Sequence, residues 1–334
     1  MPPGVPAGVR VAPLGDAAAR AAYAALAAVS PQRTPFASLA FADAACDALG
    51  YTGRIALDAD ADGTVQIGAV LFEEARRLVV PALAPHSGPL FRTDVGLADA
   101  ARVGAFLNAA TAGMRSAAFA LAPEVTDVRP FTWAGFTATL RYTYRGPSGP
   151  DGAPPYVRKM VRENGPVRAD GSLRASGTAT AFEPDAAADV VAAMGRAMAR
   201  AGRPLPVPPD RAERLLRALV AAGVARIVVA DTASRRVGAV ATLADDRTGH
   251  FWIGSGDAGP SMLLMMAATT AALAADGVGR FDLAGANLAR VSVFKQRFGL
   301  PLVPYVHVAR TGSRLLRARD ALRSVMRPPT LEAL

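Results

Sequence analysis

The sequence predicts a mixed α/β (α+β) protein made of two halves that follow one plan, each a mostly antiparallel sheet flanked by helices. Two observations predict this. The segment GPSGPDGAPP, residues 146–155, is too rich in proline and glycine for a helix or an inner strand, and it divides the chain into parts of similar length. On each side of it, helices precede a run of short strands, and further helices and strands follow. We therefore expect one domain over residues 1–150 and a second over residues 151–334.

The first half opens with a short strand, VRVAPLG, which ends at a turn. An alanine-rich helix from Asp16 to about Val29 follows, and Ser38 is the expected N-cap of a second helix. Three β-type runs come next, GRIALDAD, TVQIGAVLFE and RRLVVPALA. The segment DADADG between the first two lacks the alternating ligands of a calcium loop, so we interpret it as a hairpin turn. A helix over residues 97–113 and the strands SAAFALA and FTATLRYTYR complete this half.

The second half repeats this order. Helices over residues 184–200 and 209–222 precede three strands, ARIVVAD, VGAVATLAD and GHFWIGSG. A helix from Ser261 to about Ala275 leads into the strand RFDLAG. The short helix LARVSVFKQRFG ends at Gly299 as its C-cap, and the strand LVPYVHVA closes the half.

The composition is that of a well-packed globular protein, with 51% hydrophobic and 19% charged residues. The net charge of +9 suits an anionic partner such as RNA, an acidic membrane surface or a phosphorylated substrate, and equally a generic basic surface. The single cysteine, Cys46, excludes an intrachain disulfide, and we interpret it as a buried structural thiol. The three histidines are far apart in the sequence, and no metal-ligand spacing is found, so no metal site is expected. No signal peptide or membrane-spanning run is indicated, and we expect a cytoplasmic protein.

Lys295 stands out because the chain has only two lysines against thirty-five arginines. An ammonium is a compact donor that can lose its proton when it is desolvated, whereas a guanidinium is planar and permanently charged. Survival of this lysine therefore indicates a position that needs an ammonium, although a solvated helix face would also accept one.

The motifs around Lys295 resemble a known family. The second half has the element order of the GNAT N-acyltransferases, and FDLAGAN…FKQRFGLPLVPY resembles the signature of their FemABX-like branch, in which two GNAT-type domains stand in tandem. In the first half, PFTWAGFTATLRYTYR and TPFASLAF resemble further motifs of that branch. These similarities extend over residues 34–308. The resemblance implies two tandem GNAT-like domains.

Two departures from the family pattern bear on the donor substrate. Acetyl-CoA-using GNAT enzymes usually carry a Gln/Arg-x-x-Gly-x-Gly/Ala loop, whereas this chain has GSGDAGPSMLL, in which Gly254, Gly256 and Ser261 are candidates for an anion site at a helix start. The chain also lacks the long charged coiled-coil arm of some aminoacyl-tRNA-dependent members. Acyl-CoA and aminoacyl-tRNA both stay open as donors, and no tightly bound cofactor is expected.

The resemblance implies transfer of an acyl or aminoacyl group to an amine through a tetrahedral oxyanion. Lys295 is the candidate cation for the oxyanion or for a donor phosphate. Asp282 is the candidate that orients the acceptor amine or takes its proton; alternatively, it bonds the turn amides of Gly285 and Ala286.

Six further residues are candidates for substrate binding, and each has a structural alternative. They are Arg141, Tyr142, Tyr144, Asn287, Phe294 and Tyr305. Strand alternation separates Arg141 from Tyr142 and Tyr144, and the tyrosines have the better claim. We expect Asn287 to act instead as an N-cap, Phe294 as core, and Tyr305 as a half-buried strand residue. Trp133 is expected to pack in the interior.

The sequence defines the binding partners less closely than the fold and the candidate site residues. The acceptor is expected to be a small-molecule amine or a cell-envelope precursor, and tRNA is a candidate partner. Residues 311–326 predict an amphipathic, arginine-rich helix that docks on its own domain or contacts lipid head groups or RNA. The alternative function is that of a catalytically silent relative that binds an anionic ligand or partner. The acyl group, the pathway and the oligomeric state are not predicted.

Overall fold

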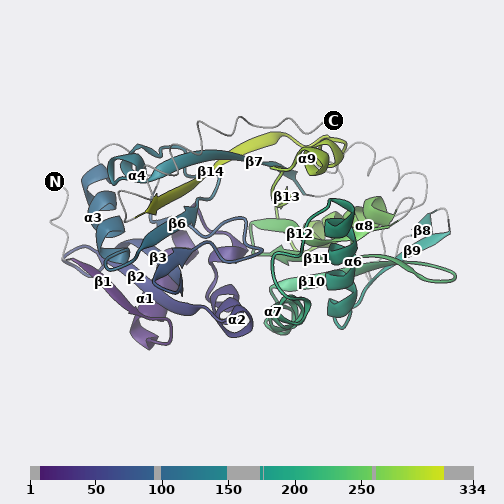
Figure 1. The fold of residues 1–334 in the computed structure, drawn as a ribbon, viewed down its shortest axis with the longest axis horizontal. Coiled ribbons are helices and arrows are strands. Elements are labelled where there is room, and N and C mark those ends of the chain that lie inside the picture. The colour runs from purple at the N-terminus through teal and green to yellow at the C-terminus, as the bar shows by residue number, and fades with distance from the viewer. Residues whose placement is uncertain (1–7, 94–98, 149–173, 176, 258–260, 312–334) are drawn as a thin grey trace. The chain divides into compact units, whose positions relative to one another are not determined.

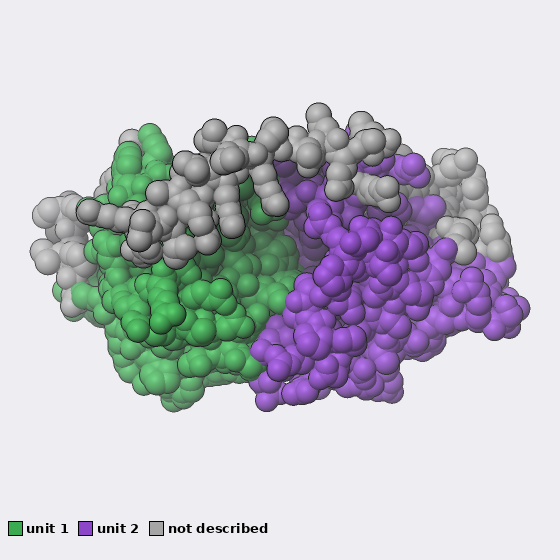
Figure 2. All heavy atoms as spheres, viewed as in Figure 1, with its two compact units in different colours: residues 1–46, 50–141, 304–334 green, residues 47–49, 142–303 purple. Residues whose placement is uncertain are grey.

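The computed structural model describes residues 8–93, 99–148, 174–175, 177–257 and 261–311 (Figure 1). The chain divides into two units, coloured separately in Figure 2. Unit 1 comprises residues 1–46, 50–141 and 304–334, and unit 2 comprises residues 47–49 and 142–303. The strands β7 (Thr137–Pro147) and β14 (Leu302–Thr311) each contribute residues to both units.

Unit 1 is a mixed, mostly antiparallel sheet with helices packed on it. Its strands follow the order β1-β2-β3-β4-β6-β14, with β5 paired to β3, and among these described strands only β4 and β6 pair in parallel. The strands are β1 (Val9–Pro13), β2 (Thr52–Ala59), β3 (Val65–Glu74), β4 (Arg77–Val79), β5 (Leu90–Phe91) and β6 (Ser116–Ala120). The helices are α1 (Ala17–Val29), the 3₁₀ turn η1 (Pro35–Ala37), α2 (Leu39–Leu49), α3 (Ala100–Ala110) and α4 (Arg129–Trp133).

Local sequence signals explain where the first two helices begin. The Asp16 side chain accepts a hydrogen bond from Ala19 N at 2.7 Å, and the Ser38 hydroxyl accepts one from Phe41 N at 3.1 Å. Each satisfies one of the amides that have no partner within the first turn of a helix. Both expected helix starts are confirmed.

Unit 2 has the same kind of sheet, in the order β7-β13-β12-β11-β10-β9-β8. All its printed strand pairs are antiparallel except β12 with β13. The strands are β8 (Arg174–Ala175), β9 (Thr178–Phe182), β10 (Ala225–Thr232), β11 (Arg236–Ala244), β12 (Thr248–Gly256) and β13 (Arg280–Asp282). The helices are α6 (Ala187–Arg200), α7 (Pro209–Ala221), α8 (Ser261–Ala275) and α9 (Ala289–Gln296).

The two units repeat one topology. In unit 1, β1 pairs with β2 after two helices, β2-β3-β4 form a meander, and α3 leads to β6, which pairs in parallel with β4. In unit 2, β9 pairs with β10 after α6 and α7, β10-β11-β12 form a meander, and α8 leads to β13, which pairs in parallel with β12. The predicted mixed fold class with two tandem, similarly built parts is confirmed.

Helices cover both faces of the unit 2 sheet. The helix α8 packs on the face that carries Val228, Ala230 and Val240, and with them it forms the core of the unit. The helix α6 packs against β11 and β12, and none of its described buried residues belongs to that core. It therefore lies on the opposite face, as Figure 1 also shows.

Several local expectations were wrong. Trp133 lies in α4 and is 62% exposed, so it does not pack in the interior. The strand β7 continues through Gly146 and Pro147, which the sequence predicts to lie in the linker. Gly299 has a φ of +68° but lies beyond the C-cap of α9, which is Arg297. Residues 304–311 of β14 belong to unit 1, where the strand pairs with β6.

The predicted C-terminal basic helix over residues 311–326 lies almost wholly outside the described residues. Within the described part of the chain, no helix has both the length and the apolar character needed to cross a membrane.

Candidate active site

The parallel strands β12 and β13 of unit 2 separate after three paired positions, of which the last joins His250 and Asp282. Beyond this point β12 continues to Gly256, while β13 ends. The strand β12 carries a β-bulge just after His250. Trp252 is the extra residue, because Phe251 pairs with Thr242 of β11 and Ile253 pairs with Ala241. A bulge bends its strand and increases the local twist. The result is a fork between β12 and the loop that follows β13.

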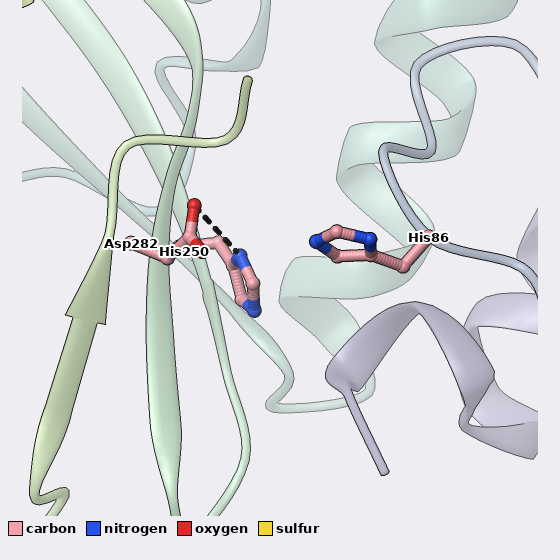
Figure 3. A group of neighbouring side chains, drawn as sticks. All are labelled: His86, His250 and Asp282. Atoms are coloured by element: carbon pink, nitrogen blue, oxygen red, sulfur yellow. Dashed lines mark ion pairs between the residues drawn. The ribbon is translucent and has the colours of Figure 1, made fainter. Parts of the chain in front are cut away.

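A buried polar cluster lies at the base of this fork. The Asp282 carboxylate, which is fully buried, accepts a hydrogen bond from the Thr143 hydroxyl at 2.6 Å and one from Ala284 N at 2.6 Å. His250 lies beside it, with Nδ1 3.8 Å from Oδ1 (Figure 3). On its other side, Arg145 Nε lies 3.9 Å from Oδ2. The carboxylate is therefore surrounded by groups from two other strands, β7 and β12, and from the turn that follows it.

Figure 3 also labels His86, which belongs to unit 1, where its ring packs edge-on against Tyr305 at 4.9 Å between centroids. Within the described residues of unit 2, no third histidine, cysteine or carboxylate joins His250 and Asp282 to make a metal-ligand set.

The loop after Asp282 continues along β7 although it is not a strand. Leu283 N donates to Tyr144 O at 2.9 Å, and Ala286 N donates to Tyr142 O at 2.7 Å. Ala284 and Gly285 have φ values of +54° and +95°, and the left-handed value is unusual for an alanine. Conformations of this kind persist only where the surroundings hold them, and they are frequent at functional sites.

Lys295 supplies part of that restraint. Its ammonium donates to the carbonyl oxygens of Leu283 and Gly285, on either side of Ala284. An ammonium carries three donors, so two are committed to the loop. Burial lowers the pKa of Lys295 from 10.5 to about 8, while the negative charge of Asp282 acts in the opposite direction. The lysine thus keeps its loop in shape and titrates near neutral pH.

The substrate-binding candidates on β7 differ in exposure. Tyr144 is 7% exposed and belongs to the core, and its hydroxyl lies 3.4 Å from Ser292 Oγ on α9. Tyr142 is 36% exposed. Arg141, which is exposed, falls in unit 1. The structure therefore leaves Tyr142 as the accessible tyrosine of the pair.

The expected N-cap role of Asn287 is wrong. The N-cap of α9 is Leu288, with no side-chain hydrogen bond. The Asn287 side chain instead accepts a hydrogen bond from Tyr142 N at 2.9 Å, which ties the end of the loop to β7. The expectation for Asp282 is also corrected in detail, because the turn amide that it binds is that of Ala284, not Gly285 or Ala286.

The remaining candidates are divided between the two units. Phe294 is 37% exposed on α9 and packs edge-on against the buried Phe298, with 5.1 Å between the ring centroids. The expectation that Phe294 is a core residue is therefore wrong. Tyr305 is 7% exposed and belongs to unit 1, not to the unit that holds Lys295.

The donor-loop candidates lie where β12 ends and α8 begins. Gly254 has a φ of +124°, and a Cβ there would overlap the Ala239 carbonyl oxygen of β11. A Cβ on Gly256 would overlap the hydroxyl of Ser261, the first residue of α8. Both glycines are thus required by close packing. The residues between them and α8, 258–260, lie outside the described part of the chain.

This arrangement combines an ammonium that titrates near neutral pH, a buried carboxylate and the start of a long helix in one unit. The ammonium and the helix start can stabilise negative charge that develops in a reaction or hold an anionic substrate, and the carboxylate can orient or accept a proton. Residues 148–296 match a family model described as "Acetyltransferase (GNAT) domain". This part of the chain is therefore similar to a GNAT acetyltransferase domain.

Solved structures support the same fold for most of the chain. The structure of FemX aligns with a TM-score of 0.65 at 12% identity, over 90% of this chain and 98% of that one. A tandem GNAT protein from the clavulanic acid biosynthesis pathway aligns with a TM-score of 0.55 at 13% identity, over 91% and 99%. The C-terminal domain of a putative lysylphosphatidylglycerol synthetase from Agrobacterium fabrum aligns with a TM-score of 0.53 at 14% identity, over 93% and 96%. At these identities the likeness concerns the fold. A comparison with curated proteins found no match.

Sequence reasoning missed three members of the candidate site, which are Thr143, Arg145 and His250. The first two lie on the opposite side of β7 from the tyrosines that were preferred. The alternation of Arg141, Thr143 and Arg145 along that side was visible in the sequence. Their importance depends on the pairing of Arg145 with Asp282, which joins segments more than a hundred residues apart.

Proposed function

We propose that this protein transfers an acyl or aminoacyl group from an activated donor to an amine, and that the fork between β12 and the loop after β13 is the place of transfer. One observation carries the proposal: within a part of the chain similar to a GNAT domain, Lys295 and Asp282 lie on either side of a strained loop at that fork.

The reaction needs no protein nucleophile, because the acceptor amine attacks the donor carbonyl directly. The attack forms a C–N bond and creates a tetrahedral oxyanion. The oxyanion collapses as the C–S bond of the thioester or the C–O bond of the aminoacyl ester breaks, and the proton of the amine ends on the released thiol or hydroxyl group. The Lys295 ammonium has one donor beyond the two that hold the loop, and that donor stabilises the oxyanion or a donor phosphate. Asp282 orients the acceptor amine or accepts its proton, through its bond to Thr143 or after the cluster opens.

Acyl-CoA and aminoacyl-tRNA are the two donor classes of the proposal. Both are polyanions, which suits a chain of net charge +9. The first residue of α8, Ser261, follows the glycines of β12, and the positive end of this helix dipole favours a phosphate there. The likeness to FemX and to the lysylphosphatidylglycerol synthetase domain supports testing aminoacyl donors and cell-envelope acceptors beside acyl-CoA and small amines.

A donor and acceptor panel tests the proposal. The purified protein is incubated with acyl-CoA thioesters or charged tRNAs and with amines that include cell-envelope precursors, and N-acylated products are detected by mass spectrometry. We expect one donor class to give product that depends on enzyme concentration. Dependence on salt separates the classes, because tRNA binding weakens steeply with rising salt.

Lys295→Met provides the decisive variant, and Lys159→Met is its matched control, since Lys159 is the only other lysine and lies outside the described residues. We expect Lys295→Met to lose about 10²-fold or more in turnover, with Lys159→Met close to wild type. Saturable donor binding without turnover in any combination would favour the silent binding protein instead.

A further inference from the structure

Unit 2 has a cavity at the edge of its core, and this cavity shares no lining residue with the Lys295 loop or with the polar cluster at the fork. Its volume is about 240 Å³, and it lies between the C-terminal half of α8 and the strands β9, β10 and β11. Three apolar side chains of its wall, those of Phe182, Leu273 and Val278, belong to the core of the unit or pack against it. An apolar protein cavity of about 150 Å³ can hold a molecule of the size of benzene. The space is therefore large enough for an aromatic ring with a short substituent.

The charged residues of the wall are already engaged. Arg226 on β10 and Asp276, which follows α8, form an ion pair with each other. Their side chains are 53% and 42% exposed, so this side of the cavity is open to solvent. Asp245 and Asp246 also have interaction partners, and the Asp245 carboxylate accepts hydrogen bonds from two backbone amides of its own turn, both at 2.8 Å. A charged ligand would therefore have to displace an existing contact.

Two threonine hydroxyls of the wall, by contrast, have no hydrogen-bond partner among the described residues. Thr242 on β11 is 5% exposed and Thr269 on α8 is 2% exposed, and the hydroxyl oxygen of each is buried. A helical threonine commonly donates to a carbonyl one turn earlier, as Thr270 does to Met266 O at 3.0 Å. Thr269 makes no such bond. Buried hydroxyls without partners are uncommon and destabilising, so each needs an explanation such as a water or a ligand.

We propose that this cavity is a second binding site of unit 2, and that it takes a small neutral molecule with an apolar body and a hydroxyl or carbonyl oxygen. The apolar body packs against Phe182 and Leu273, and the oxygen accepts hydrogen bonds from the hydroxyls of Thr242 and Thr269.

The neutral class of ligand follows from which groups of the wall have partners. The two hydroxyls lack them, and a hydroxyl is satisfied by a neutral oxygen without any countercharge. The charged groups are engaged, and a buried charge without a partner is far more costly than a buried neutral oxygen. The inference rests on the volume, the apolar wall and the two hydroxyls, and it is independent of the proposed acyl transfer.

The test uses three probes that share one ring and differ in its substituent, toluene, benzyl alcohol and benzylamine. Binding to the full chain is measured by titration of the methyl resonances of Leu273 and Val278 in the wall. We expect saturable binding of benzyl alcohol, with toluene and benzylamine each roughly tenfold weaker, because toluene leaves the hydroxyls without a partner and benzylamine brings a charge. Toluene or benzylamine that binds as tightly as benzyl alcohol would overturn the proposal, and so would the absence of a saturable shift.

A double variant, Thr242→Val with Thr269→Val, makes the test specific. It keeps the shape of both side chains and removes both hydroxyls, so it should reverse the preference, and toluene should bind at least as tightly as benzyl alcohol. The double variant should also unfold at no lower urea concentration than wild type, because the hydroxyls that it removes have no partner among the described residues. Thr270→Val is the matched control, since Thr270 does not line the cavity and bonds its own helix, and it should keep the preference for benzyl alcohol.

The location of the site is tested by Ala272→Leu, which adds bulk to the wall and should abolish the binding of all three probes. A retained preference for benzyl alcohol in the double variant, or full binding by Ala272→Leu, would refute the assignment. A crystal structure in which ordered waters satisfy both hydroxyls and benzyl alcohol does not displace them would refute it as well.

Discussion

Replacement of Lys295 by methionine should change how the stability of unit 2 depends on pH. Methionine has a similar length but cannot carry a charge. The folded protein holds the Lys295 ammonium in a partly buried position, which lowers its pKa to about 8 from the ordinary 10.5. Below pH 8 both the folded and the unfolded protein carry the proton, and the folded state bears the cost of burying it. Between pH 8 and 10.5 only the unfolded state keeps the proton, so the free energy of unfolding rises with pH.

The magnitude follows from the two pKa values. A lowering from 10.5 to about 8 corresponds to about 3.4 kcal/mol in total. Of this, about 2.5 kcal/mol is regained between about pH 7 and pH 10, and this is an upper value because the side chain is partly exposed. The Lys295→Met variant has no ammonium at this position and therefore lacks this pH-dependent part of the unfolding free energy. The difference in unfolding free energy between wild type and Lys295→Met should therefore shift by up to about 2.5 kcal/mol in favour of wild type as the pH rises.

Urea unfolding at pH 7 and pH 10 measures this difference, and the two tryptophans make it specific. Trp252 is buried in unit 2, and Trp133 is exposed in unit 1. In a Trp133→Phe background, the fluorescence of Trp252 reports on the unit that holds Lys295. An identical pH dependence in the two proteins would refute the burial of the ammonium and with it the argument that Lys295 is tuned to titrate near neutral pH.

Three further predictions concern the same unit. Thr143→Val removes the hydroxyl that joins Asp282 to Gly285 N and should lower the unfolding free energy by about 2 kcal/mol. Urea unfolding should show that Thr143→Ser, which keeps the hydroxyl, retains most of this stability, and an equal loss in the valine and serine variants would contradict the hydrogen-bonding role. Gly254→Ala should cost about 3 kcal/mol, because its Cβ would overlap the Ala239 carbonyl at a φ of +124°; a melting temperature within a degree of wild type would show that β12 adjusts. Asp282→Asn should reduce kcat by about 10²-fold or more in the transfer assay, and unchanged turnover would remove Asp282 from the mechanism.

Local signals predicted much of the fold. Asp16 and Ser38 are capping residues placed directly before apolar helical runs, and both cap their helices as expected. The repeated order of helices and strands predicted two similarly built parts, because element order depends on periodicity within short windows. Lys295 was singled out by its rarity, and the structure places it against the loop that follows Asp282.

What could not be predicted depends on contacts between distant segments. Thr143 contacts Asp282 only because β7 pairs with β13 in one register, and no local pattern fixes that register. Asn287 was expected to cap α9, but the helix begins later, and the side chain bonds β7 instead. Trp133 is expected to pack in the interior, but it lies on an exposed turn of helix.

The most direct test of the account is the turnover of Lys295→Met and Lys295→Arg with the donor and acceptor that the panel identifies. The account predicts a loss of about 10²-fold or more in kcat for the methionine variant. It predicts a large loss for the arginine variant as well, because a planar guanidinium cannot replace an ammonium between the carbonyls of Leu283 and Gly285. Wild-type turnover in either folded variant would contradict the claim that the Lys295 loop is the site of acyl transfer.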